Sequence, residues 1–216
     1  MRPYLALDCE TSGLNRQLSE VLELGYCFDD FKTPIGLLPS ANIIVDNPVW
    51  NYSESYAMQM NIRLIQAQNN KDVAKVHPKE TFSHLFEATR YAADKAALWD
   101  EEQSAKETDP ANRWKPLRRV SIAGKNASVF DIPVLTAYFM RKEIAPNILA
   151  EWQSYLHYKY IDVGSVYYSR FGYIPSLSEI NKLTGRNEVS HKAIDDALDV
   201  VYAVRYSLGV PYDSVI

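Results

Sequence analysis

Three short apolar runs open the chain, and they constrain its fold more than any other feature. They are Tyr4 to Leu7, Val21 to Phe28 and Ile35 to Val45, and the turn-forming pair Asp29-Asp30 follows the second of them. Short apolar runs bounded by turn residues are typical of β-strands, and close spacing along the chain favours hairpins between them. The sequence therefore predicts that the chain begins with three strands joined by hairpins.

The remainder of the chain alternates between helical and strand-like patterns. The stretch from Trp50 to His77 is rich in Asn and Gln and has helical spacing at Met58, Ile62 and Ile65. The other expected elements are a helix over 82–98, a strand over 120–123, a helix from about 131 to 142, a strand over 160–163, and helices over 177–183 and 192–208. This order predicts an α/β fold with a mixed five-stranded sheet flanked by helices on both faces.

Length and composition favour one domain. The chain has 216 residues, of which 47% are hydrophobic, so it can bury a sizeable core, and we interpret residues 1–216 as a single domain. Residues 50–116 are expected to form a helical and loop insertion in that domain. Within this insertion, Asp100 to Arg113 is charged and interrupted by proline, which predicts an exposed loop.

Charge and cysteine content exclude several classes of protein. The formal net charge of −4 is not that of a basic nucleic-acid coat, so a nucleic-acid partner would be held locally, by metal or by a few basic residues. Cys9 and Cys27 are the only cysteines, which argues against a cysteine zinc site; a reduced chain is the simpler expectation, and a Cys9–Cys27 disulfide is the alternative. The N-terminal apolar stretch is too short for a signal peptide and no run approaches a membrane span, so we expect a cytoplasmic protein without a membrane partner.

Asp8 and Glu10 follow the first apolar run and are two residues apart. Side chains at this spacing on a strand point to the same face, so two carboxylates project together from a segment that should be buried. Unpaired carboxylates are costly to bury, and a hard divalent cation such as Mg²⁺ or Mn²⁺ would offset that cost. The alternative is a solvated strand end. After Glu10, the stretch Thr11-Ser12-Gly13-Leu14 predicts a tight turn that brings backbone amides near a ligand.

The C-terminal helix places one aspartate toward the core. Projection at 3.6 residues per turn puts Asp196 on the edge of the apolar stripe, where it needs a partner such as a metal ion or a hydrogen-bond donor. Asp195 is interpreted as a surface acid near the helix N-terminus. The apolar stripe consists of Ala193, Ala197, Val200, Val204 and Leu208. The opposite side of the helix consists of Asp195, Asp199, Tyr202 and Tyr206.

His191 precedes this helix by a short distance. Inside one regular helix it would pair better with Asp195, and it converges with Asp196 only if it lies in the approach to the helix. The remaining histidines have no defined acidic companion and are expected to be structural or exposed: His77, His84 and His157.

Asp131 and Asp162 each sit where a capping acid is expected. Pro133 fits only the first turn of a helix, so a helix starts close to Asp131. By itself Asp131 is therefore interpreted as a cap or first-turn acid, and Asp162, at a strand end before a helix, as a cap.

Taken together, three segments resemble the motifs of the DEDD exonucleases. LALDCETSGL is similar to the first motif, Asp-x-Glu-Thr-x-Gly; NASVFDIPVL to the second; and SHKAIDDA to the third, His-x-Ala-x-x-Asp-Ala, which marks the histidine subclass, DEDDh. YIDVGSVYY and SLSEINKLTG are similar to the segments that link the second and third motifs, and AMQMN to a substrate-side helical segment. A single motif is a weak signal, whereas three in order and in matching contexts are a strong one.

The resemblance implies a ribonuclease H-like fold and a role for each motif residue. It implies that two divalent ions, Mg²⁺ or Mn²⁺, are held by Asp8, Glu10, Asp131 and Asp196. It also implies that His191 is the general base, and that four positions approach the terminal nucleotide: Thr11, Ser12, Leu14 and Asn126. The chain departs from the family pattern at Lys125-Asn126, where many members have His-Asn, and at Cys9, which should point to the opposite face and pack.

The implied activity is 3′→5′ hydrolysis of DNA or RNA with release of nucleoside 5′-monophosphates. A single-stranded or frayed 3′ end is the expected partner, and no separate polymerase-binding segment stands out. Two alternatives stay open: a non-catalytic nucleic-acid- or protein-binding module on the same fold, and a hydrolase that acts only on short oligonucleotides. Oligomeric state and the choice between DNA and RNA stay open as well.

Overall fold

The computed structural model describes residues 1–48, 52–186 and 189–212, and its centre is a five-stranded mixed sheet. The strands are β1 (Tyr4–Thr11), β2 (Val21–Asp29), β3 (Ser40–Ile44), β4 (Ser121–Gly124) and β5 (Ile161–Asp162), in the order β3-β2-β1-β4-β5. β2 pairs antiparallel with both β1 and β3, whereas β4 pairs parallel with β1 and β5 pairs parallel with β4. The predicted mixed five-stranded sheet is therefore confirmed.

Two strands are shorter than the sequence predicts. Pro34 begins a 3₁₀ turn, η1 (Ile35–Leu37), so the extended conformation starts only at Ser40. Proline has no amide hydrogen to give to a sheet ladder, and Pro34 and Pro39 bracket the part that stays outside the strand. β5 pairs at only two positions, because Asp162 caps the helix that follows at once.

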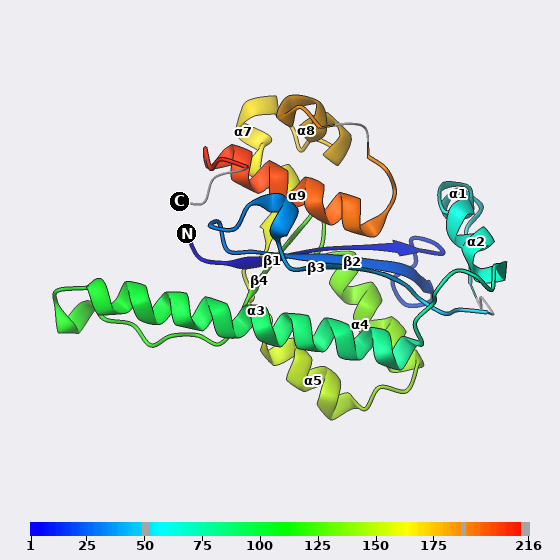
Figure 1. Ribbon diagram of the computed structural model, residues 1–216, viewed down its shortest axis with the longest axis horizontal. Helices are drawn as coiled ribbons and strands as arrows, with labels where there is room; N and C mark the ends of the chain where they lie inside the picture. The colour runs from blue at the N-terminus through cyan, green and yellow to red at the C-terminus, as the bar shows by residue number, and fades with distance from the viewer. Residues whose placement is uncertain (49–51, 187–188, 213–216) are drawn as a thin grey trace.

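Helices cover both faces of the sheet (Figure 1). One face carries α3 (Pro78–Lys106), α4 (Asp131–Arg141) and α5 (Pro146–Ser154), and the other α6 (Val163–Val166), α7 (Tyr168–Phe171), α8 (Leu177–Thr184) and α9 (Ala193–Ser207). The alternation of β1 supplies a core on each side: Leu5 and Leu7 pack in the cluster that contains Trp152, and Tyr4 and Ala6 in the other cluster. The helix expected after Asp162 is α6, whereas α5 and α7 were not predicted.

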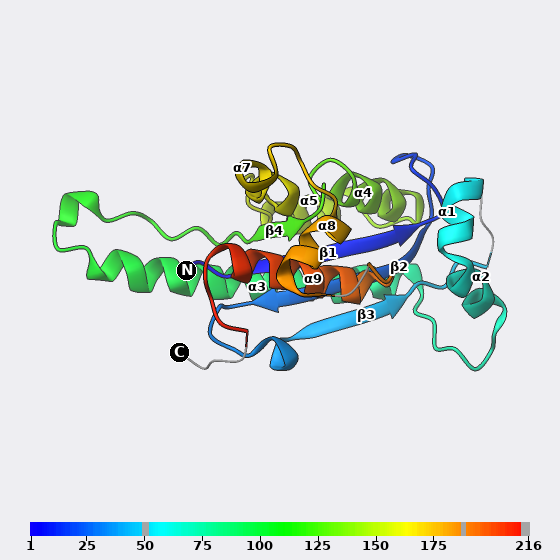
Figure 2. The ribbon, with the colours of Figure 1, turned by 90° about the horizontal axis from the view of Figure 1, so that it is seen from above.

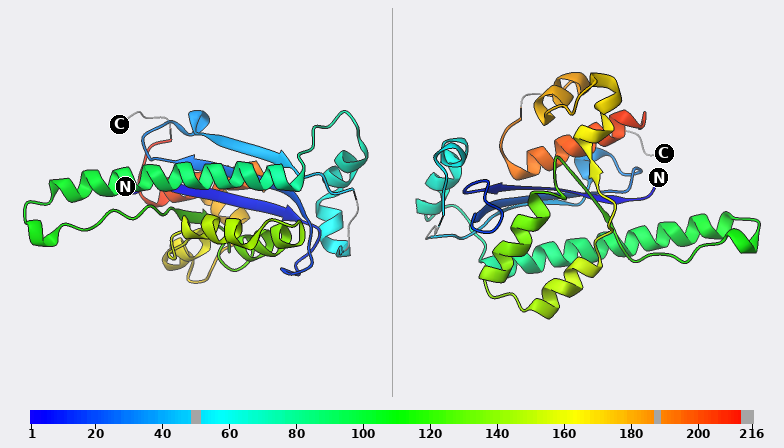
Figure 3. Two further views of the ribbon diagram at one scale, coloured as in Figure 1. Left: turned by 90° about the horizontal axis from the view of Figure 1, so that it is seen from below. Right: turned by 180° about the vertical axis from the view of Figure 1, so that it is seen from behind.

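The helix α3 continues beyond the segment that the sequence predicts as helical, so the exposed loop predicted from Asp100 is wrong for residues 100–106. Asp100 and Ser104 are buried because other segments return over them. Arg2 binds the Asp100 carboxylate with two nitrogens, and Ser104 Oγ donates to the Trp114 carbonyl. This end of α3 and the segment that returns to β4 project past the sheet (Figure 3).

Two short helices lie at the other end of the sheet, α1 (Ser55–Met60) and α2 (Ile62–Asn69), beside the carboxyl end of β1 (Figure 2). Their buried side is not the predicted one, because Ile62 is 59% exposed whereas Ala57, Leu64 and Ala67 are buried. Trp50, where the predicted helical stretch begins, lies outside the described residues. No helix in the described ranges is long and apolar enough to cross a membrane.

Candidate active site

The carboxyl end of β1 presents Asp8 and Glu10 on one face of the sheet. Along the paired strand β2, Asp8 lies opposite Gly25 and Glu10 opposite Glu23. Both acids share the face of Ala6, which packs in the cluster formed with α9. The predicted pair of carboxylates is thus partly buried and faces the C-terminal helix.

Gly25 allows the start of α9 to touch the sheet. A Cβ atom at this position would lie 2.1 Å from the carbonyl carbon of Ala193, and no side chain fits there. Glycine inside a strand often marks such a close approach of another backbone. The contact brings the first turn of α9, which contains Asp196, over the strand that bears Asp8 and Glu10.

Asp196 is 5% exposed, and its Oδ1 accepts no hydrogen bond from the described residues. Burial, with the charge of Glu10 next in importance, raises its pKa to about 8. Asp195 instead accepts a hydrogen bond from Ser190 Oγ at 2.9 Å. The two neighbouring aspartates therefore differ as predicted: Asp196 faces inward, and Asp195 is tied to the surface loop.

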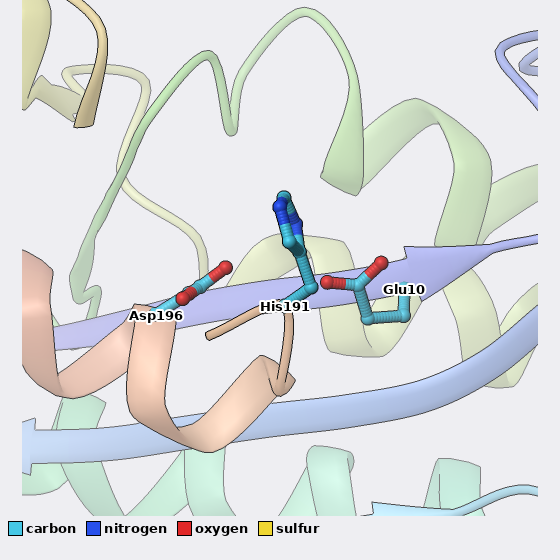
Figure 4. A group of neighbouring side chains, drawn as sticks. All are labelled: Glu10, His191 and Asp196. Atoms are coloured by element: carbon cyan, nitrogen blue, oxygen red, sulfur yellow. The ribbon is translucent and has the colours of Figure 1, made fainter. Parts of the chain in front are cut away.

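His191 lies outside α9, in a backbone conformation that few non-glycine residues adopt (φ 53°). Because the helix begins only at Ala193, helical periodicity does not apply to His191. One ligand atom from each of Glu10, His191 and Asp196 lies within 4.8 Å of the other two (Figure 4). The predicted convergence of His191 with Asp196 is what the structure shows.

Asp131 approaches the same strand end from the opposite layer. It is the first residue of α4 and is 3% exposed, and its Oδ1 accepts hydrogen bonds from the amide (3.0 Å) and the Sγ (3.2 Å) of Cys9. Burial raises the pKa of Asp131 to about 6. Asp131 is thus a first-turn acid, since the N-cap residue is Phe130, and Cys9 packs in the core, as predicted.

The four acids crowd one another. Burial raises the pKa of Asp8 well above its usual range, and the charges of Asp131, Asp196 and Glu10 raise it further. Burial also raises the pKa of Glu10 to about 7, against a hydrogen bond from Asn61 that lowers it. Asp8 and Asp131 do not belong to the closest group of ligand atoms around Glu10. The arrangement is an excess of buried negative charge that a cation would relieve.

The four residues predicted to approach a nucleotide have different environments. Thr11 and Ser12 are buried, and both hydroxyls are used internally: Thr11 Oγ1 donates to the Gly13 carbonyl, and Ser12 Oγ to the Tyr52 carbonyl. Leu14 is 66% exposed and lines a pocket at the strand end. Asn126 is exposed, with its amide bonded to Asp162 Oδ1. Their roles toward a nucleotide stay a prediction.

The pocket beside Leu14 lies between Glu10, His191 and the helix α1. Its lining includes Glu10, His191, Tyr56, Met60, Asn61 and Phe130. Sequence reasoning missed Asn61 as an individual residue, although the AMQMN segment that contains it was singled out. Asn61 is 2% exposed and donates from Nδ2 to the Thr11 carbonyl, so it ties the helices to the first motif.

Two further predictions concern acids outside the site. Asp199 was expected on the exposed side of the helix, and that is wrong: it is 4% exposed, because Asn181 and Arg186 reach it from the segment before α9. Asp162 is confirmed as a cap, since it accepts the Ser165 amide at 2.9 Å.

No family model and no curated protein matches the sequence. Solved structures do. Exonuclease I from Methylocaldum szegediense aligns over 95% of this chain with a TM-score of 0.60 and 16% identity, and Escherichia coli exonuclease I in complex with a dT13 oligonucleotide over 96%, with 0.56 and 15%. The chain spans only 41% of each of these two proteins.

The third likeness is to Schizosaccharomyces pombe Pop2p in a Mg²⁺- and Mn²⁺-bound form. It covers 94% of this chain and 83% of Pop2p, with a TM-score of 0.54 and 13% identity. At such low identity a likeness establishes the fold alone. Sheet order, flanking helices and these three alignments agree, and the chain therefore has the ribonuclease H-like fold of the DEDD exonucleases.

Proposed function

We propose that the protein is a metal-dependent 3′→5′ exonuclease of the histidine subclass that releases nucleoside 5′-monophosphates from DNA or RNA. The observation that supports this most is the buried Asp196 carboxylate, whose Oδ1 has no partner within the described residues and which lies beside Glu10 and His191. A buried polar atom without a partner is costly unless something outside the chain completes it.

The donor set fits a hard divalent cation. All four acids of the three motifs, Asp8, Glu10, Asp131 and Asp196, gather at one strand end, and each has a raised pKa. Carboxylate oxygens are the ligands that Mg²⁺ and Mn²⁺ prefer. Two such ions, when bound by these residues, would activate water and stabilise the charge that develops on the phosphate.

His191 would take the proton of the attacking water. Its ring lines the pocket, is partly exposed and lies against the acidic group without being enclosed by it. A neutral imidazole is suited to accept a proton near neutral pH. The pocket between Leu14, Tyr56 and Asn61 would receive the terminal nucleotide, and its apolar and aromatic lining favours an unpaired base.

Metal-dependent shortening of a strand from its 3′ end tests the proposal. The assay uses 5′-end-labelled single- and double-stranded DNA and RNA with Mg²⁺ or Mn²⁺, and a set of short oligonucleotides identifies a hydrolase restricted to them. We expect a ladder that shortens from the 3′ end, and no activity in Asp8→Ala or in excess chelator. Asp94→Ala is the control, because Asp94 only pairs with Arg118 on the surface of α3. Activity that persists with chelator, or in Asp8→Ala, contradicts the proposal.

A further inference from the structure

A second buried acid lies next to the site and belongs to none of the motifs. Glu23 on β2 is fully buried and faces Glu10 across the strand pair. Its carboxylate is saturated: Asn42 Nδ2 and Arg63 Nη1 donate to Oε1 at 2.9 and 3.0 Å, and Arg63 Nη2 and the Ala193 amide bind Oε2. Glu23 is therefore unlike the motif acids, because its oxygens have no room for a metal ion.

The guanidinium of Arg63 connects Glu23 to the histidine. Besides its two bonds to the carboxylate, Arg63 donates from Nη2 to the carbonyl oxygen of His191 at 2.6 Å. Glu23 in turn holds the amide of Ala193. The Arg63–Glu23 ion pair thus hydrogen-bonds to the backbone on both sides of Lys192, at the His191 carbonyl and at the Ala193 amide.

The backbone conformation of His191 requires such a restraint from its surroundings. Its φ of 53° lies in the left-handed region, which a residue with a Cβ occupies only when its surroundings impose it. Helical hydrogen bonding does not supply the restraint, because α9 begins at Ala193. Arg63 comes from the start of α2, next to Asn61, so the same helix that contacts the first motif also fixes the histidine.

We infer that Arg63, oriented by Glu23, is a positioning residue that holds His191 in the geometry needed to take a proton. This inference rests on the proposed function for its effect on rate, but the placement of the imidazole is a property of the folded protein alone. Arginine is required because its planar fork serves a carboxylate and a carbonyl at once, whereas lysine offers a single nitrogen.

The chain contains a matched control for this arrangement. Arg2 binds both oxygens of the buried Asp100, at 2.9 and 3.1 Å, and donates from Nη2 to the Arg119 carbonyl at 2.7 Å. It therefore makes the same kind of contacts as Arg63, but with the projecting end of α3 rather than with the site. Arg2→Lys therefore measures how much the stability of the protein falls when one such guanidinium is lost.

Single-turnover kinetics measure the role in rate. We expect Arg63→Lys to slow the chemical step by roughly tenfold to a hundredfold, as small misplacements of a reacting group do, with little change in KM or in Mg²⁺ requirement. The same substitution in a His191→Asn background should have no further effect. An equal loss in both backgrounds, a loss confined to KM, or a rate like that of Arg2→Lys would overturn the inference.

Nuclear magnetic resonance of the histidine rings gives a readout that does not need activity. The chain has four histidines, and comparison with His191→Asn identifies the ring signal of His191. We expect Arg63→Lys to shift or broaden that signal while the others and the Tm stay close to those of Arg2→Lys. An unchanged His191 signal would refute the positioning role even if the enzyme is active. A changed signal in a protein without nuclease activity would instead refute the proposed function and keep the positioning role.

A second substitution guards against misfolding. The double variant Glu23→Gln with Arg63→Met removes both charges, so no unpaired buried charge remains. We expect it to fold and to show the same altered His191 signal and rate loss as Arg63→Lys. A folded double variant with the wild-type signal would count against the inference.

Discussion

The two ends of β1 treat a buried carboxylate in opposite ways. At the amino end, Asp29 pairs with Arg205, and both side chains are fully buried. Asp29 also accepts hydrogen bonds from the Tyr4 hydroxyl at 2.9 Å and the Phe31 amide at 2.8 Å. At the carboxyl end, Asp196 is almost as buried, but its Oδ1 has no partner in the described part of the chain.

The difference separates a structural acid from a functional one. A buried charge is tolerated when the fold supplies the opposite charge and the hydrogen bonds, as Arg205 does for Asp29. Where the fold supplies acids instead, as around Asp8, the neutral form is favoured until a cation arrives. Burial alone therefore does not identify a site; at Asp196 the charged neighbours are acids, and the fold supplies no counter-charge.

The largest expected effect is on the base. In His191→Asn all four acids remain, so metal and a nucleic-acid end should still bind, while the chemical step slows by roughly two to four orders of magnitude. Because a protonated histidine cannot accept a proton, the wild-type rate should fall as the pH is lowered, and the variant should lose that part of the profile. Rate against pH in single turnover, together with the Tm, makes the measurement. A stable variant with wild-type rates would remove His191 from the mechanism.

The next largest difference is expected between substitutions of the neighbouring residues Asp195 and Asp196. We expect Asp196→Asn to lose several kcal/mol of transition-state stabilisation, or roughly two to three orders of magnitude in rate. Asp195→Asn should stay within a few-fold of wild type, because Asp195 only accepts a bond from Ser190. The measurement is kcat at saturating Mg²⁺. The reverse order of severity would mean that the histidine works with Asp195.

At the opposite end, the expected loss is in stability. Asp29→Ala leaves Arg205 buried without its counter-charge, which should cost about 3–5 kcal/mol in the free energy of unfolding. Denaturant unfolding measures it, with Asp8→Ala as the contrast. Asp8→Ala relieves crowding between acids and should raise the stability of the metal-free protein. If both variants lose stability equally, the two ends do not differ as described.

The acids at the carboxyl end of β1 should make the stability of the metal-free protein depend on pH. The pKa values of Asp131, Glu10 and Asp196 rise to about 6, 7 and 8 in the folded chain. Unfolded carboxyl groups titrate near 4, so the folded state holds more protons between about pH 4 and pH 8, and stability falls as pH rises through that window. Mg²⁺ should restore stability at pH 8 more than at pH 5. Melting curves with and without Mg²⁺ test this, and a Tm that rises steadily from pH 5 to pH 8 without metal contradicts it.

Salt should have the smallest effect. With a net charge of −4, substrate engagement is expected to be local, with fewer than roughly six phosphate contacts. The dependence of KM on KCl concentration, measured for a single-stranded 3′ end, gives the number of phosphate contacts. A steep slope would indicate that a larger basic surface contacts the phosphates of the substrate.

The sequence by itself determined what depends on neighbours along the chain. The alternation of β1, the start of α4 near Asp131, the cap at Asp162 and the inward direction of Asp196 are local consequences of periodicity and capping, and the structure shows each of them. The order of three motifs also indicated the ribonuclease H-like fold, since the resemblance spans nearly the whole chain. The catalytic roles of the motif residues stay a prediction.

The tertiary structure alone decided which polar groups meet across long separations. Arg63 reaches a carbonyl 128 positions away, and Asp100 is buried by an arginine 98 positions away, so neither periodicity nor propensity could reveal them. Asp199 is the same case: its helical position is exposed by projection, and only the segment before α9 covers it. Hydrogen bonds between distant segments depend on strand register and helix packing. Because those are properties of the assembled fold, the Glu23–Arg63–His191 connection became visible only there.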